Sequence, residues 1–154
     1  MRRKPVPLEE LPALAERWCG HLGLSVQVRP EPSGDEELFP NRVVLAGSDA
    51  ALFMADRGQP LDALQYLLHE AQMLKDDARL VYLDVRGMRR FRMTELKAMT
   101  ELAIEKARAT GSFTFGPLSP RERRWIHVLV SREEGLATES EGTGNFKPLK
   151  IFRA

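Results

Sequence analysis

The sequence predicts an α+β protein of two small domains, each with helices packed on a short sheet. Segments with helical periodicity alternate with short apolar segments of strand type along all 154 residues. One junction, at residues 84–87, divides this series near the middle, so we expect domains over residues 1–86 and 87–154. Hydrophobic residues make up 43% of the chain and charged residues 29%, proportions that indicate a globular protein and exclude a disordered or fibrous one.

The first half is expected to contain three helices and three strands. A helix is predicted over 8–22, because Leu11, Ala15 and Trp18 recur at helical spacing. Alternating residues predict strands over 24–29 and 41–47, which should pair as an antiparallel hairpin. A short helix is then expected over 49–54, a break over 55–58, a longer helix from Pro60, and a buried strand over 80–85.

The second half begins with a long helix, predicted over 89–109, and a short strand over 112–115. The next helix has the strongest start signal in the chain, since Ser119, Pro120 and Glu122 form a capping box with proline at the first helical position. Closing strands are expected over 136–138 and 146–152, around a loop rich in Glu and Gly.

Few residues of the sequence favour catalysis or metal binding. The one cysteine, Cys19, excludes an internal disulfide and a cysteine-rich zinc site. The three histidines, His21, His69 and His127, fall in different predicted helices, and none has a second ligand at metal-binding spacing. No P-loop, Gly-x-Gly-x-x-Gly or Gly-x-Ser-x-Gly pattern occurs. We therefore expect no cofactor, no metal and no enzymatic activity.

The location of the protein is predicted from what its segments lack. No apolar run approaches the ~18 residues needed to cross a bilayer, so no membrane span is expected. The basic start, MRRKPVPLEE, has no apolar segment behind it and does not resemble a signal peptide. A cytoplasmic location is the simplest prediction.

Charge is distributed unevenly along the chain. The segment Arg79–Arg132 holds 12 Lys/Arg against 5 Asp/Glu, whereas the remainder holds 11 against 17, which gives net charges of +7 and −6. A basic segment of this kind indicates an anionic partner, and a solvated helix surface explains it about as well.

The stretch SPRERRWIH places two cationic side chains one helical turn apart. Arg123 and His127, at i and i+4, project from one face of the capped helix, with Arg124 beside them and Arg121 in the first turn. Arginines on a rigid support bind phosphates well. Trp125 offers a ring for base stacking, but its apolar neighbours favour a place in the core. His127 as a half-buried, hydrogen-bonded residue of the fold stays an open alternative.

Three further segments carry a resemblance to a known family. ERRWIH, with TESEG at 138–142 downstream, resembles the R3H domain, named after its Arg-x-x-x-His pattern. Together with LDVRGMRRFR, these segments resemble the bacterial Jag proteins (SpoIIIJ-associated proteins), in which a type II KH domain precedes the R3H domain. RGQPLDALQYL is similar to the family's stretch after its Gly-x-x-Gly loop. The resemblance runs from about Leu8 onward.

The resemblance implies a fold for each half. Residues 1–86 would form a KH type II-like domain, a three-stranded sheet packed with helices. Residues 87–154 would form an R3H domain, a small three-stranded sheet with two helices.

The resemblance also implies a function: cytoplasmic, non-catalytic binding of single-stranded RNA, and of DNA as a second ligand. Arg123 and His127 match the signature pair, and the implied contacts near it are Arg121, Arg124, Thr138, Ser140 and Gly142. The Gly-x-x-Gly loop reads Ala55-Asp56-Arg57-Gly58 here, so that Arg57 and Gly58 are its implied nucleic-acid contacts.

The departures at Ala55 and Asp56 predict a weak KH-like loop. A methyl group at Ala55 should restrict the backbone, and Asp56 places a negative charge where phosphate should pass. We therefore expect the basic R3H half to supply most of the affinity. Two alternatives stay open: a protein-interaction scaffold whose partner is a small KH-only protein, and a hydrolase that uses His127 as its base.

Overall fold

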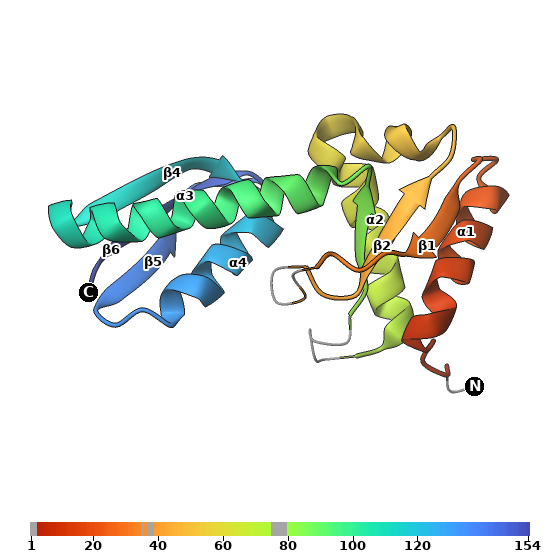
Figure 1. The fold of residues 1–154 in the computed structure, drawn as a ribbon, viewed down its shortest axis with the longest axis horizontal. Helices are drawn as coiled ribbons and strands as arrows, with labels where there is room; N and C mark the ends of the chain where they lie inside the picture. The colour runs from red at the N-terminus through yellow and green to blue at the C-terminus, as the bar shows by residue number, and fades with distance from the viewer. Residues whose placement is uncertain (1–2, 35, 37–38, 75–79) are drawn as a thin grey trace. The chain divides into compact units, whose positions relative to one another are not determined.

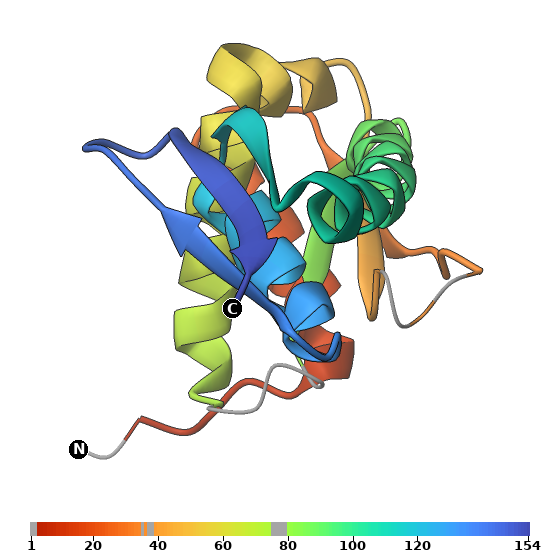
Figure 2. The same ribbon diagram turned by 90° about the vertical axis from the view of Figure 1, so that its left-hand side faces the viewer.

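The structure is a computed structural model that describes residues 3–34, 36, 39–74 and 80–154 (Figures 1 and 2). The chain divides into two compact units, Met1–Arg92 and Met93–Ala154, and each is described by itself. Arg79, at which the basic segment begins, lies outside the described residues. Within the described residues, no helix is both long and apolar enough to span a membrane.

The first unit places helices over a three-stranded mixed sheet. Its elements follow in the order η1 (Leu8–Glu10), α1 (Leu11–His21), β1 (Gln27–Pro30), β2 (Arg42–Ala46), η2 (Ala50–Met54), α2 (Ala55–Gln72) and β3 (Tyr82–Val85). The strand order is β1-β2-β3, with β1 antiparallel and β3 parallel to β2. The parallel pair needs a long crossover, which η2 and α2 provide. The predicted hairpin is thus confirmed.

Each main element of the first unit contributes one row of apolar side chains to the core. α1 and α2 carry the helical stripes that the sequence predicts, and the strands face them with alternating or continuous apolar residues. Fully buried members include Leu11, Leu45, Leu61, Leu68 and Leu83.

A buried carboxylate organises the end of β3. Asp84 is fully buried and accepts hydrogen bonds from Arg42 Nε at 3.0 Å and from the backbone N–H groups of Val85, Arg89 and Arg90 at 2.8, 2.8 and 3.2 Å. Arg42 also donates to Glu31, through its Nη1, at 3.3 Å to Oε1. Asp84 thereby satisfies the first N–H groups of the following helix, which would otherwise lack partners. The junction after β3 is held by this carboxylate.

The second unit is a three-stranded antiparallel sheet with helices. α3 (Met88–Thr110) begins in the first unit and is followed by β4 (Ser112–Leu118), α4 (Pro120–Ser131), β5 (Leu136–Ser140) and β6 (Lys147–Arg153). The strand order is β4-β6-β5, so the last strand of the chain is the central one. α4 packs against β5 and β6 (Figure 2). Buried residues of this unit include Leu96, Phe115, Ile126, Leu149 and Ile151.

The α+β class expected from the sequence is confirmed, and the predicted elements occur in the predicted order. β5 is longer than predicted: it runs to Ser140, so that Glu139 and Ser140 are strand residues and not loop residues. The pairing of Glu139 with Lys150 and of Ser140 with Leu149 explains the extension, because both partners belong to the central strand.

Candidate nucleic-acid interface

The start of α4 is fixed by the capping box that the sequence predicts. Glu122 N donates to Ser119 Oγ at 3.3 Å, and Ser119 N donates to a carboxylate oxygen of Glu122 at 2.8 Å. Pro120 occupies the first helical position, where its missing N–H costs nothing. The first turn of α4 is therefore a rigid support for the side chains that follow.

Arg123 joins three segments of the second unit. Its Nη1 donates to the backbone oxygen of Leu118, at the end of β4, at 3.0 Å and to that of Asn145, in the β5–β6 loop, at 2.9 Å. The guanidinium is partly buried, and its Nε and Nη2 groups make no hydrogen bond to any residue that the structure describes. One edge of the guanidinium is therefore anchored, and the other edge is left for an acceptor from outside.

His127 lies one turn further along α4 and faces β5. Its Nδ1 forms a hydrogen bond with Thr138 Oγ1, and its Nε2 lies 3.3 Å from Ser140 Oγ. The pKa of His127 is lowered from its ordinary value of 6.5, first by burial, which disfavours the charged ring, and second by the nearby Arg123 cation. The imidazole is therefore neutral at neutral pH, with one ring nitrogen donating and the other accepting.

The structure brings five of the residues expected from the sequence into one region of the second unit. Arg123, His127, Thr138 and Ser140 form the hydrogen-bonded centre, and Arg124 is exposed on the same helix. Arg121 is partly buried in the first turn of α4, and Gly142 lies exposed in the β5–β6 loop with a φ of +106°. Trp125, expected in the core, is partly buried.

Arg57 and Gly58 belong to the first unit, where they form the ADRG loop (Ala55–Gly58) between η2 and the regular part of α2. Asp56, Arg57 and Gly58 all have a left-handed backbone, with φ of 50°, 58° and 80°. Ala55 has a φ of −58° and a ψ of 150°, which an alanine adopts without strain. The loop therefore turns after Ala55, and its left-handed residues are the three that follow.

Arg89 holds the ADRG loop and was not identified from the sequence. Its Nη2 donates to the backbone oxygen of Gly58 at 3.0 Å and to Asp62 Oδ1 at 2.5 Å. Arg89 lies in the first turn of α3, 31 residues after Gly58 and 27 residues after Asp62. No local spacing signals such a contact.

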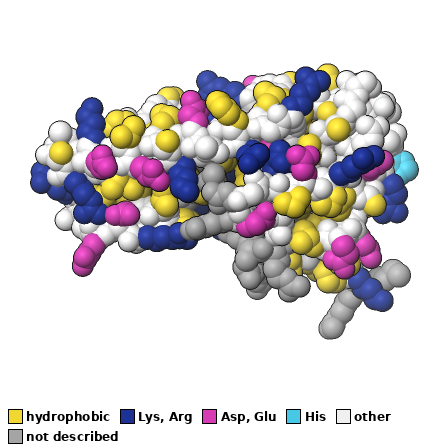
Figure 3. All heavy atoms as spheres, viewed as in Figure 1, with side chains coloured by type: hydrophobic (Ala, Val, Ile, Leu, Met, Phe, Trp, Pro, Cys, Tyr) yellow, Lys and Arg dark blue, Asp and Glu magenta, His cyan; other side chains and the backbone are white. Residues whose placement is uncertain are grey.

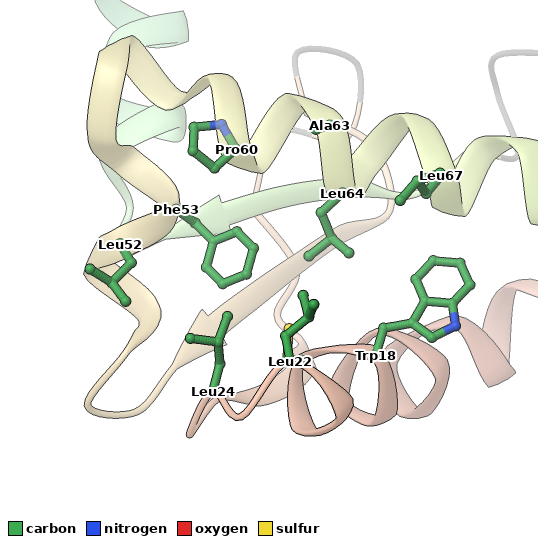
Figure 4. Close-up of a pocket in the computed structure, with 10 residues that line it drawn as sticks. Trp18, Leu22, Leu24, Leu52, Phe53, Pro60, Ala63, Leu64 and Leu67 are labelled. Carbon is green, nitrogen blue, oxygen red and sulfur yellow. The ribbon is translucent and has the colours of Figure 1, made fainter.

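An apolar groove of about 330 Å³ opens between α1, η2 and α2 (Figure 4). Trp18 approaches it from α1, Leu22 from the residue that follows α1, and Pro60, Leu64 and Leu67 from α2. Leu22, Leu52 and Leu67 are also exposed at its rim. This groove has no charged residue in its lining.

No cluster of three or more His, Cys, Asp or Glu side chains suitable for a metal ion occurs among the residues that the structure describes. The chemistry that the second unit offers is hydrogen bonding from cationic and hydroxyl groups. Cationic groups on a helix match the acceptor oxygens of a phosphate backbone.

Comparison with known proteins gives two matches. The R3H domain family matches residues 94–153, which is nearly all of the second unit. An RNA-binding protein KhpB from Clostridium symbiosum is 32% identical to the chain over 152 residues, which cover 97% of this chain and 68% of that protein.

Proposed function

Since the chain belongs to the Jag family, as its R3H domain and its likeness to KhpB over nearly the whole chain establish, we propose that it binds single-stranded RNA through the R3H site of α4 and β5. A cytoplasmic location is part of the proposal, because that is where bacterial single-stranded RNA is made and used.

The half-anchored guanidinium of Arg123 is the observation that carries this proposal. Two backbone oxygens hold its Nη1, which removes much of the side-chain freedom that a phosphate contact would otherwise have to freeze. The remaining Nε and Nη2 edge is suited to a bidentate phosphate contact. Arg124, exposed on the next position of α4, adds a second cation for the same backbone.

In this proposal Thr138 and Ser140 act through His127. Their hydroxyls bind both ring nitrogens, so they fix the ring against β5 and keep α4 in place. Arg121 and Gly142 border the same surface, from the first turn of α4 and from the β5–β6 loop.

The same geometry argues against a hydrolase. A histidine base needs a neighbour that stabilises the imidazolium that forms, as a carboxylate does. His127 instead has Arg123 nearby, which lowers its pKa, and a hydroxyl on each ring nitrogen. We propose that the protein binds without catalysis.

The test is fluorescence anisotropy of short labelled single-stranded RNA and DNA across a salt series. The variants are Arg123→Ala and His127→Ala, each checked by a thermal melt, and Lys97→Ala is the control, because it removes one exposed positive charge from α3 in the same unit. We expect the folded Arg123→Ala variant to bind more weakly than Lys97→Ala by roughly 10-fold or more, as for a charge-assisted contact. Equal binding by the parent and both site variants would refute the site.

A small KH-only protein is the second partner that we propose, because the apolar groove of the first unit offers it a surface. Exposed leucines lie at the rim of the groove, and no charged residue lines it, as expected at the centre of a protein interface. Leu67→Arg should abolish binding of a purified KH-only protein in size-exclusion chromatography. Tyr66→Arg, on the neighbouring exposed position outside the groove, is the control; equal loss with both variants would contradict the groove.

A further inference from the structure

The first turn of α3 exposes an aromatic side chain among arginines. Phe91 is 73% exposed, and Met88, one turn earlier, is 49% exposed. Helical spacing places these two on the same face. Residues 86–92 contain no acidic side chain and four basic ones, Arg86, Arg89, Arg90 and Arg92. Figure 3 shows Lys and Arg side chains on the face over which α3 runs, with hydrophobic and acidic side chains between them.

The backbone around Arg86 is held in a strained conformation. Arg86 has a φ of +53°, which is unfavourable for a residue that carries a Cβ atom. Asp84 imposes this turn, since it binds the N–H groups of Val85 and Arg89 on either side. Arg86 is exposed, and its side chain makes no hydrogen bond or ion pair within the part of the chain that the structure describes. The turn therefore presents this cation to solvent.

An anion at this surface would be bound by side chains and not by the helix end. The N–H groups of Arg89 and Arg90 are already bound to Asp84. The Arg89 side chain is bound as well, to Gly58 and Asp62. The exposed cations of this turn are Arg86 and Arg90.

The contact of Arg89 with Gly58 also places the ADRG loop beside the first turn of α3, within the same unit. Arg57, next to Gly58, is exposed. Exposed cations thus occur on both sides of the Arg89–Gly58 contact: Arg57 in the loop, and Arg86 and Arg90 at the start of α3.

We propose that the first turn of α3 is a second contact for single-stranded nucleic acid, in which Phe91 stacks on an unpaired base while Arg86 and Arg90 bind the phosphates beside it. An exposed ring next to cations fits a strand whose bases are unpaired, because a duplex keeps its base faces stacked. The four arginines of residues 86–92, with no acidic residue among them, favour this ligand over an apolar protein segment. The inference takes its ligand class from the proposed function but rests on residues of the other unit.

The test uses a fluorescein-labelled oligouridylate of about twelve nucleotides, a length within the usual site sizes for single strands. Loss of a stacked base typically weakens binding roughly five- to 150-fold, and we expect a loss of that order for Phe91→Leu, with affinity retained in Phe91→Tyr. Tyr66→Leu and Leu102→Ala are matched controls, because these side chains are 63% and 67% exposed on other helical surfaces. Equal losses in Phe91→Leu and in the controls would overturn the inference.

An abasic oligomer of the same length separates stacking from other effects of the substitution. The Phe91→Leu variant should bind this probe as well as the parent does, because the probe has no base to stack. If Phe91→Leu weakens both probes equally, Phe91 does not stack on a base and the inference fails.

Arg86→Gly separates binding from folding. Glycine adopts a positive φ without strain, so the Tm of this variant should not fall, whereas its affinity for the oligouridylate should. Unchanged affinity at unchanged Tm would overturn the role of Arg86.

The two sites can fail separately. If Arg123→Ala loses binding while Phe91→Leu and Arg86→Gly bind as the parent does, the α3 contact is refuted and the R3H site stands. The reverse pattern supports the α3 contact and refutes the R3H site. A parent protein that binds no oligomer refutes both.

Discussion

His127 shows how a signature residue serves the fold and a binding site together. Both ring nitrogens form hydrogen bonds with hydroxyl groups of β5, so the ring connects α4 to the sheet. Arg123 likewise donates to the backbone oxygens of Leu118 in β4 and Asn145 in the β5–β6 loop, but the Nε and Nη2 edge of its guanidinium makes no such bond within the described residues. In the proposed function the two residues therefore have different roles: Arg123 would contact the phosphates, and His127 would position the helix that carries Arg123.

The lowered pKa of His127 predicts a stability that depends on pH. Because the folded-state pKa lies below the unfolded value of 6.5, the unfolded chain binds the proton more readily. The stabilisation by the neutral ring is present above pH 6.5 and is lost as the pH falls through the folded-state pKa. We expect the Tm of the parent to fall more steeply on acidification than that of His127→Gln, which keeps a donor and an acceptor but does not titrate.

Differential scanning calorimetry at pH values from about 7.5 to 5 measures this difference. All other ionisable groups are common to the two proteins, so only the difference between the two curves reports on His127. Parallel curves would mean that His127 has the same pKa in the folded and unfolded chains.

At the residue scale, the sequence predicted spatial relations between side chains that lie near one another along the chain. The four-residue spacing of Arg123 and His127 and the three-residue capping box are local, so helical geometry alone relates them. The pairs Arg42–Asp84 and Arg89–Asp62 join residues 42 and 27 positions apart. The one local signal for these pairs was Asp84, which lies inside the apolar run LVYLDV. A buried carboxylate needs a partner, but the sequence did not identify which residue it is.

At the element scale, boundaries followed from local signals except where tertiary pairing decided them. Proline, glycine and the capping box fixed the helix ends that the structure has, whereas β5 extends beyond its prediction because β6 provides partners for Glu139 and Ser140. In the ADRG loop, by contrast, a departure from the expected sequence pattern leaves the backbone geometry at that position ordinary. Its sequence departs from Gly-x-x-Gly at Ala55, yet Ala55 has an ordinary backbone, so the departure there does not harm the turn.

The loop geometry predicts separate effects for the two departures from Gly-x-x-Gly. Ala55→Gly should leave RNA affinity unchanged, because position 55 needs no positive φ. Asp56→Lys should tighten binding, because it replaces an exposed negative charge with a positive one beside the expected phosphate path. Anisotropy titrations of the two single variants measure this, with Glu70→Lys, a charge reversal at an exposed position elsewhere in the first unit, as the control.

The opposite pattern, tighter binding with Ala55→Gly alone, would show that flexibility and not charge limits the loop. No change with either variant would mean that the ADRG loop is not on the nucleic-acid path.

At the scale of the whole molecule, the charge contrast along the sequence does not coincide with the two units. Residues 1–92 hold 13 Lys/Arg and 14 Asp/Glu, and residues 93–154 hold 10 and 8, so the net charges are −1 and +2. The contrast of +7 against −6 arises because the basic segment, Arg79–Arg132, begins within the first unit and includes the arginines around the start of α3. The expectation that the R3H half supplies most of the affinity thus loses its electrostatic basis, and affinity shared by both units is the better prediction.

Shared affinity has a measurable signature in the salt dependence of binding. For a single strand, the slope of log K against log salt becomes shallower by about 0.7 for each phosphate that the protein no longer neutralises. We expect Arg123→Ala and Arg86→Gly each to reduce the slope by about that amount, and the double variant by about twice as much, because they remove phosphate-binding cations from different units. Phe91→Leu should weaken binding at every salt concentration while the slope stays that of the parent, since stacking releases no counterions. A slope reduced only by Arg123→Ala would confine phosphate binding to the R3H unit, and one reduced by Phe91→Leu would mean that this side chain acts by positioning its arginine neighbours.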